Sequence, residues 1–328
     1  MTKELETAST DLVGAPLTEE ETARVVAALA DSRAASTRRA YASKWHTWSR
    51  WCQATNRPPL PADGAHVAAY LTQLVEDGKS LSTINGMAAA IRAYHEDAGL
   101  DDPTASAGVR RVRAGLTRRL GVASTKQAHA LTVLELQRMV ATCDKDGVRG
   151  ARDRAVLLLG FAGAMRRSEL AALEVSDINR MRDGVALTIR ESKGDQTKQG
   201  QQVGVTWGTN KETCPITALY AWLDLLGIDS GPIFCRVTRH NTVPIKVSAL
   251  TGESIDQIVK ARAELAGLGG LPISGHSLRA GHATTAAEHG VDAARIARTT
   301  RHVRLETLAK YVRPSQALKD TTAKDLGL

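Results

Sequence analysis

Apolar residues in the first hundred positions recur every three or four residues, which is the spacing of amphipathic helices rather than strands. Trp45, Trp48 and Trp51 stand three apart and therefore fall on one side of their helix, whose other side is basic. Gly78 and Gly99 follow two of the segments, as glycine does at helix ends. The pattern predicts helices over residues 17–32, 36–56, 62–78 and 80–99, and a compact helical domain over 18–116.

The second domain, residues 131–328, is predicted to be helical with one small sheet. Val185, Leu187 and Ile189 alternate with other residues, and residues 201–207 repeat the alternation after a polar loop that contains glycine. This indicates an antiparallel pair of strands. Helical spacing predicts helices over residues 131–144, 148–164, 166–179 and 214–227, with further helices beyond them. We therefore expect a mainly α protein, with a helical N-terminal domain and a mixed α/β C-terminal domain.

The segments that flank the first domain lack this periodicity. Residues 1–17 are polar and acidic, and we expect them to be a disordered leader. A strongly basic stretch from residue 110 passes into a segment rich in Ser, Thr, Gln and Ala, which indicates a helix end followed by an interdomain linker over residues 117–130. The basic run has a second interpretation, as the solvated face of a helix.

The chain carries a net charge of +8 at pH 7 and has a pI of about 9.5. Residues 1–31 hold seven acids against Lys3 and Arg24, so the remainder is more basic than the average. A basic body favours a polyanionic partner, of which nucleic acid is the commonest inside cells.

Membranes and disulfide bonds are not expected. No apolar run reaches the roughly 18 residues of a membrane span, and the N-terminus has no apolar signal-peptide segment. The four cysteines are scattered and form no CxxC pair, which favours a reduced, cytoplasmic protein.

Several common catalytic motifs are missing from the sequence. It contains neither a GxxxxGK[ST] phosphate loop nor a GxGxxG that follows a strand, so no nucleotide cofactor is expected. Ser277 lies in a stretch close to GxSxG, but Arg279 occupies the place of the second glycine, which argues against a serine hydrolase. The nearby histidines do not follow the HExxH spacing and have no clustered cysteines, so a zinc site is disfavoured and no metal is expected.

Four separated segments together hold the groups needed to cleave a phosphodiester, although each has an ordinary explanation alone. Two arginines neutralise the non-bridging oxygens with fixed fork geometry. A histidine helps a tyrosine to lose its proton, and a loop lysine protonates the departing sugar hydroxyl. The expected product is a covalent phosphotyrosine, formed without ATP, metal or water. The segments are GAMRRSEL (163–170), RESKGDQTKQG (190–200), SGHSLRAGH (274–282) and TRHVRLETLAKYV (300–312).

The order and spacing of these segments resemble the tyrosine recombinase, or phage integrase, family. The resemblance extends from about residue 20 to the end of the chain and is greatest to Cre-type simple site-specific recombinases. It implies an N-terminal core-binding domain of the SAM-like type, followed by a catalytic domain. His302 stands nine residues before Tyr311, where Cre has tryptophan and most of the family has histidine. The implied catalytic residues are the phosphate-binding Arg166 and Arg279, the supporting acid Glu169, Lys193 in the β-hairpin turn, His276, His302 and the nucleophile Tyr311.

The resemblance also implies a clamp of two domains around duplex DNA. Phosphate contacts position such a protein, whereas base contacts select the sequence. Glu253 has two interpretations, as a cytosine-reading residue and as an acid that stabilises the start of a helix. The residues expected to face DNA are Arg38, Arg39, Lys44, Ser82, Thr83, Asn85, Arg92, Arg110, Arg111, Arg113 and Lys126.

The sequence thus predicts a site-specific DNA recombinase that forms 3′-phosphotyrosine links and exchanges strands through a Holliday junction. The expected partners are double-stranded DNA with an inverted-repeat site and, on paired sites, three further copies of this chain in a homotetramer. Without DNA we expect a monomer or dimer. Two alternatives stay open, a type IB topoisomerase and a non-catalytic DNA-binding protein. The tail after Tyr311 bears on the first, because a recombinase of this type docks its tail on a neighbouring protomer.

Overall fold

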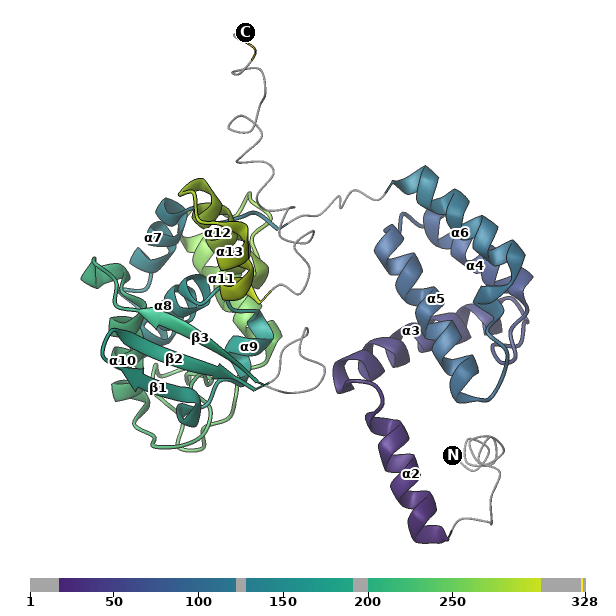
Figure 1. Cartoon of the computed structure of the whole chain (residues 1–328), viewed down its shortest axis with the longest axis horizontal. Coiled ribbons are helices and arrows are strands. Elements are labelled where there is room, and N and C mark those ends of the chain that lie inside the picture. The colour runs from purple at the N-terminus through teal and green to yellow at the C-terminus, as the bar shows by residue number, and fades with distance from the viewer. Residues whose placement is uncertain (1–17, 122–127, 191–199, 302–325, 327–328) are drawn as a thin grey trace. The chain divides into compact units, whose positions relative to one another are not determined.

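The computed structural model describes residues 18–121, 128–190, 200–301 and 326 (Figure 1). Internal contacts divide the chain into two units, Met1–Ser124 and Thr125–Leu328. In the described residues of both units most elements are helices, and the second unit contains a three-stranded antiparallel sheet. The predicted fold class, mainly α with a small antiparallel sheet, is therefore confirmed.

The described part of the first unit is entirely helical apart from its connections. Helix α3 packs against α5, and α4 packs against α6 (Figure 1). Four of the helices correspond to the four that the sequence predicts, and the fifth, α6, covers the basic stretch that the sequence interprets as a helix end. The helices are α2 (Glu19–Asp31), α3 (Ala35–Ala54), α4 (Gly64–Glu76), α5 (Leu81–Asp97) and α6 (Ala107–Leu120), with a short 3-10 helix at Pro103–Ala105.

The tryptophans of α3 lie on one side and pack into the unit, as their spacing predicts. Trp48 is fully buried, and its indole Nε1 donates to the carbonyl of Pro59 at 3.1 Å. The Trp51 ring lies 5.4 Å from that of Trp48 between centroids. The Trp45 ring stacks on Tyr94 of α5 at 4.3 Å between centroids. These rings bury large apolar areas while satisfying a polar N–H, and so tie α3 to its neighbours.

Helix α6 extends into residues 117–120, which the sequence assigns to the linker. Val109 and Leu116 of this helix are buried in the core of the unit. The helix ends at Gly121, whose φ of 70° is a conformation that glycine adopts readily. The basic run is therefore a helix with an apolar side in the core and a basic side outside it, and it continues through residue 120.

The described part of the second unit begins with three helices, continues through the sheet, and ends with four more helices. Two 3-10 helices, Val175–Asp177 and Lys211–Thr213, flank the sheet. The elements are α7 (Val133–Ala141), α8 (Gly147–Ala162), α9 (Arg167–Ala172), β1 (Ile178–Met181), β2 (Gly184–Ile189), β3 (Gln201–Thr206), α10 (Pro215–Leu226), α11 (Gly252–Leu265), α12 (Gly275–Glu288) and α13 (Ala293–Thr300).

The sheet has the order β1-β2-β3, and both pairs are antiparallel. Val185 pairs with Val205 across β2 and β3, which confirms the two predicted strands. Strand β1 was not predicted, because residues 178–179 were assigned to the end of a helix. Three of its four residues are exposed, so this edge strand has no alternation of apolar and polar positions from which it could be recognised.

Helix α8 lies at the centre of the second unit and packs against α7, α10, α11 and α12. Its buried apolar residues include Val156, Leu157 and Leu159. Helix α12 lies very close to the segment that precedes α7, because a Cβ added at Gly281 would lie 2.2 Å from the carbonyl oxygen of Leu131. The same Cβ would lie 2.9 Å from the ring of Phe161 in α8, so α12 packs tightly against both α8 and the segment before α7. Helices α8 and α12 both lead to the candidate site described below.

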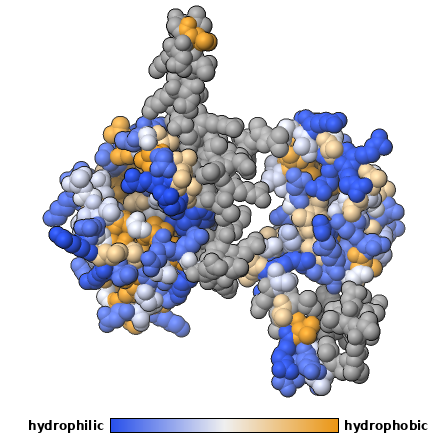
Figure 2. All heavy atoms as spheres, in the orientation of Figure 1, coloured by the Kyte–Doolittle hydropathy of each residue, from blue (hydrophilic) through white to orange (hydrophobic). Residues whose placement is uncertain are grey.

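Hydrophilic side chains cover much of the visible surface of both units, with apolar residues in scattered patches (Figure 2). Within the described residues, no helix combines the length and apolar character that crossing a membrane requires. All four cysteines are buried and unpaired by disulfides.

The close approach at Gly281 yields a stability prediction. Gly281→Ala should lower the free energy of unfolding by about 1–3 kcal/mol, because the new methyl group must displace a backbone carbonyl. Thermal or urea unfolding of the purified protein measures this difference. Gly115→Ala is the matched control, since Gly115 is also inside a helix but has no atom within 4 Å of the added Cβ. The control should be neutral or slightly stabilising, and an equal loss in both variants would contradict the packing argument.

Candidate active site

Arg166 and Glu169 pair at the start of α9. The backbone N–H of Arg166 donates to Glu169 Oε2 at 2.9 Å, and its guanidinium Nη1 donates to Glu169 Oε1 at 2.5 Å. The Glu169 side chain is 1% exposed, whereas that of Arg166 is 22% exposed. A buried carboxylate therefore orients an arginine that solvent, or a ligand, can reach.

Helix α12 begins at a defined point because two groups satisfy its first N–H groups. Asp256 of α11 accepts from the backbone N–H of Gly275 at 2.8 Å. The Oγ of Ser277, which is buried, accepts from the backbone N–H of Ser274 at 3.0 Å. Ser277 thus stabilises the helix start, which agrees with its rejection as a hydrolase nucleophile. The defined start places His276 and Arg279 in the first turns of the helix.

The carbonyl of Ala164 connects Arg279 to the segment that holds Arg166. Arg279 is 1% exposed, and its Nη1 donates to Ala164 O at 2.8 Å. Ala164 has a φ of 46°, and this left-handed residue lies between the end of α8 and Arg166. His276 stands one helical turn before Arg279 and is exposed. The structure therefore brings together Arg166, Glu169, His276 and Arg279, which are far apart in sequence.

The pKa of His276 is lowered from its ordinary value. Surrounding atoms displace water from part of the ring, even though another part is exposed, and the positive charges of Arg279 and Arg166 add repulsion. The imidazole is thus held neutral at neutral pH, and a neutral imidazole can accept a proton.

Arg301 is a component of this cluster that the sequence analysis missed. Its guanidinium Nη2 donates to Glu169 Oε2 at 2.6 Å and to Ala164 O at 2.9 Å. Burial lowers the pKa of Arg301 and the charge of Glu169 opposes this, so the guanidinium stays protonated at neutral pH. The sequence offers one signal, the position of Arg301 directly before His302, but nothing in it indicates that the side chain turns inward.

Four of the predicted functional residues lie outside the described residues. These are Lys126, Lys193, His302 and Tyr311. Their roles stay predictions. Within the residues that are described, no group of three or more His, Cys, Asp or Glu side chains is arranged to hold a metal ion.

Three residues predicted to face DNA lie close together in the first unit. Arg113 of α6 donates from Nη2 to Asn85 Oδ1 of α5 at 3.2 Å. Lys44 of α3 lies over Gly86, where an added Cβ would come within 2.8 Å of Lys44 Cε. Helices α3, α5 and α6 therefore contribute to one polar surface, which we call the Lys44–Asn85–Arg113 surface.

The other predicted DNA-facing residues of this unit differ in their surroundings. Arg92 donates from Nε to Glu96 at 2.7 Å and lies 3.7 Å from Asp102, so acids compensate its charge. The backbone N–H of Thr83 donates to Ser80 Oγ at 3.3 Å, within the N-terminal cap of α5. The remaining predicted residues are all exposed and are Arg38, Arg39, Ser82, Arg110 and Arg111.

Glu253 lies in the first turn of α11, where a negative charge is favourable. Its carboxylate pairs with Arg167 Nη1 at 3.1 Å. Of its two interpretations, the acid at a helix start has a structural basis, whereas base reading stays a prediction.

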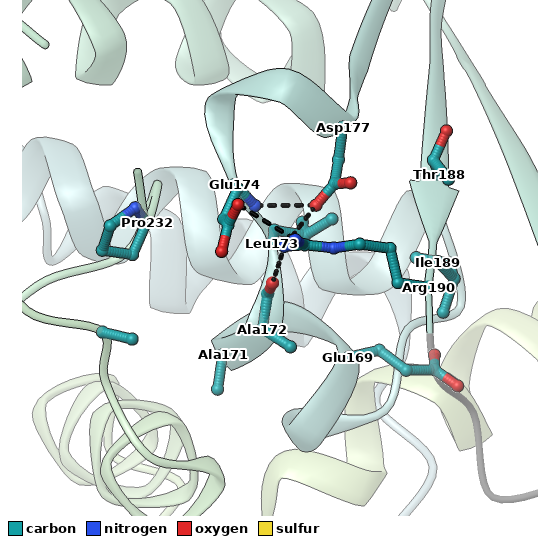
Figure 3. A pocket seen from close by; sticks show the side chains of 11 residues that line it. Glu169, Ala171, Ala172, Leu173, Glu174, Asp177, Thr188, Ile189, Arg190 and Pro232 are labelled. Atoms are coloured by element: carbon teal, nitrogen blue, oxygen red, sulfur yellow. Dashed lines mark hydrogen bonds and ion pairs between the residues drawn. The ribbon is translucent and has the colours of Figure 1, made fainter. Parts of the chain in front are cut away.

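A pocket of about 340 Å³ lies beside the site, between α9 and the end of β2 (Figure 3). Arg190 pairs there with Glu174 at 2.9 Å and with Asp177 at 3.0 Å, and it donates to the carbonyl of Ala172 at 3.0 Å. Glu169 forms part of the wall, and its carboxylate is directed away from the Arg190 ion pairs (Figure 3). The charged groups around Arg190 thus anchor the end of β2 to the segment that follows α9.

Family models match both parts of the chain. Residues 129–317 match the phage integrase family, and residues 27–98 match the phage integrase N-terminal SAM-like domain. The first match alone spans more than half of the 328 residues. The chain therefore belongs to the phage integrase family, the tyrosine recombinases.

Curated relatives agree with this assignment. An integrase/recombinase XerD homolog from Selenomonas ruminantium is 35% identical over 296 residues, which are 89% of this chain and 85% of the relative. The recombinase cre of Escherichia phage P1 is 25% identical over 282 residues, 81% of this chain and 80% of the relative. The chain is thus similar to Cre, and at higher identity to the XerD homolog. Both names describe recombinases.

Solved structures share the fold. The XerH site-specific recombinase bound to a palindromic difH substrate, in a post-cleavage complex, has a TM-score of 0.58 at 18% identity over 82% of this chain and 73% of that one. A lambda integrase tetramer bound to a Holliday junction has a TM-score of 0.54 at 14% identity over 94% of this chain and 76% of that one. At these identities the similarity is one of fold.

The Glu169 carboxylate makes folding stability depend on pH. Burial alone would raise its pKa, but Arg301 and the N–H groups of Arg166 lower it below the ordinary value of 4.5. A carboxyl whose pKa is lower in the folded state contributes stability above its unfolded pKa, and this is lost as pH falls below that value. Between about pH 5 and pH 3, the free energy of unfolding should therefore fall more steeply for the wild type than for Glu169→Gln. Urea denaturation at a series of pH values measures both slopes, and parallel slopes would contradict the assignment.

Proposed function

We propose that this chain is a site-specific DNA recombinase that cleaves and rejoins DNA through a 3′-phosphotyrosine intermediate. The observation that supports this most strongly is the convergence of Arg166 and Arg279 on one turn, through Glu169 and the Ala164 carbonyl. Two guanidinium groups held in this way match the two non-bridging oxygens of a phosphodiester.

Each step of the proposed cleavage balances without a further reactant. The Tyr311 hydroxyl passes its proton to the neutral imidazole of His276, and its oxygen bonds to the scissile phosphorus while the bond from phosphorus to the 5′ oxygen breaks. Lys193 donates a proton to the departing 5′ oxygen. His302 acts beside the phosphate, as the resemblance to the family implies. The phosphotyrosine conserves the energy of the phosphodiester, so the reverse attack by another strand's 5′ hydroxyl rejoins DNA without ATP, and no metal ion is required.

Strand exchange requires more than one copy of the chain. We propose that four copies assemble on two inverted-repeat sites and exchange one pair of strands at a time through a Holliday junction. The lambda integrase tetramer on such a junction shares the fold, which supports this arrangement. The buried cysteines without disulfides suit action in the cytoplasm.

The nucleophile is tested with Tyr311→Phe on a nicked suicide substrate, which traps the covalent product because the leaving strand diffuses away. The wild type should form a protein–DNA adduct that resists SDS, and Tyr311→Phe should form none. DNA affinity in a gel-shift assay should stay within about two-fold, since only one hydroxyl is lost. An adduct formed by the Phe variant would overturn the nucleophile assignment.

The wild-type outcome also separates the alternative activities. Absence of a wild-type adduct on a site that the protein binds would favour a DNA-binding protein without cleavage. Relaxation of supercoiled DNA that carries one site, with no exchange between two sites, would favour a type IB topoisomerase.

The salt dependence of binding tests the DNA-facing surface of the first unit. Arg39→Ala and Arg110→Ala should each weaken binding and reduce the slope of log K against log salt by about one, as expected for a lost phosphate contact. Arg92→Ala is an internal comparison, because Glu96 and Asp102 compensate its charge, and its slope should change less. Equal slopes in all three variants and the wild type would contradict this assignment of contacts.

A further inference from the structure

Arg301 combines two features that do not stabilise a fold by themselves. Its φ of 54° and ψ of 44° place it in the left-handed region, which glycine adopts without strain and arginine does not. Its side chain is 3% exposed, and burying a guanidinium is unfavourable unless partners compensate it. Other interactions must therefore compensate these two costs, and the contacts of the guanidinium identify them.

The guanidinium of Arg301 is held on two sides. Nη2 donates to Glu169 Oε2 at 2.6 Å and to the Ala164 carbonyl at 2.9 Å. Nη1 donates to the carbonyls of Gly163 at 3.1 Å and Thr299 at 2.8 Å. Arg301 thus joins the end of α13 to the turn between α8 and α9.

Two of these acceptors are the groups that hold the candidate phosphate-binding arginines. Glu169 also accepts from Arg166, and Ala164 also accepts from Arg279 at 2.8 Å. In addition, Nη2 of Arg166 lies 3.4 Å from the Arg301 carbonyl. Arg301 is therefore in contact with the supports of both arginines at once.

We propose that Arg301 is a positioning residue for DNA cleavage, which fixes the guanidinium groups of Arg166 and Arg279 relative to each other. The proposal rests on the proposed function, because it takes these two arginines as the phosphate-binding pair. Arg301 acts on the two arginines through the acceptors that it shares with them, Glu169 and the Ala164 carbonyl.

Loss of the Arg301 side chain should affect the rate of cleavage rather than DNA binding. Without it, Glu169 loses a donor on Oε2, so the carboxylate that holds the Arg166 guanidinium is less firmly fixed, while the Ala164 carbonyl keeps Arg279 as a donor. The spacing between the two guanidinium groups then changes, and small misplacements of groups that stabilise a transition state cost rate steeply.

The test is single-turnover cleavage of the nicked suicide substrate at saturating protein by the full chain. Arg301→Gly removes the side chain, and glycine adopts the left-handed conformation without strain. Any loss of cleavage rate in this variant is therefore due to the missing guanidinium and not to the backbone. Its cleavage rate should fall by about 10-fold to 100-fold, while its DNA affinity stays within about two-fold of the wild type. Arg298→Ala, which removes an exposed arginine of α13, is the matched control and should cleave at the wild-type rate.

A second substrate distinguishes positioning from a general loss of structure. A methylphosphonate at the scissile position replaces one charged non-bridging oxygen by a methyl group, so cleavage depends less on the arginine pair. If Arg301 acts through that pair, Arg301→Gly should reduce the rate less on this substrate than on the phosphodiester. A variant that is merely less folded would lose the same factor on both.

Arg301→Lys keeps the proposal testable if the glycine variant does not fold. Lysine keeps the buried charge beside Glu169 but lacks the fork that reaches Ala164 as well, so its rate should lie between those of wild type and Arg301→Gly. A cleavage rate equal to that of the wild type in a folded Arg301→Gly or Arg301→Lys variant would overturn the proposal.

Arg166→Ala separates this result from the proposed function. If Arg166→Ala abolishes cleavage in the same assay, the proposed function still stands. If Arg166→Ala cleaves normally, the proposed function itself fails.

Discussion

The carbonyl oxygen of Ala164 is the point on which the arrangement of the candidate active site depends. It accepts from Arg279 at 2.8 Å and from Arg301 at 2.9 Å. Its residue is left-handed and follows the end of α8, so the oxygen lies outside the hydrogen-bond ladder of that helix and is available to side chains. Helix α8 is held by the core on several sides. Because the turn follows directly from this close-packed helix, the Ala164 carbonyl is fixed in position, and so are the two arginine side chains that donate to it.

Charge is the second constraint on this cluster. Arg166, Arg279 and Arg301 are positive, and Glu169 is the acid that contacts two of them. Glu169 is consequently held ionised, as its lowered pKa indicates. Burial lowers the pKa of His276, and the positive charges of Arg279 and Arg166 lower it further. A phosphodiester would supply the negative charge that such a cluster favours. The pattern of shifted pKa values thus agrees with an anion-binding site without relying on the family resemblance.

Sequence patterns predicted those elements whose residues alternate between core and solvent. The three tryptophans of α3 and the alternation around Leu187 are examples, because one face of each element is buried. Strand β1 was missed because most of its residues are exposed, and the length of α6 was missed because its basic residues obscured the buried Leu116. Arg301 shows a different limit, since its role depends on contacts with residues about 130 positions away that no local pattern encodes.

The two units use arginine in opposite ways, and this is why net charge alone predicts so little of the mechanism. Arg39 and Arg110 of the first unit are exposed, so each contributes to attraction over a distance that salt screens. Arg279 and Arg301 of the second unit are buried and fixed by carbonyl and carboxylate acceptors, so salt screens them weakly. Removal of one charge should therefore alter affinity and its salt dependence in the first unit, but the rate of cleavage in the second.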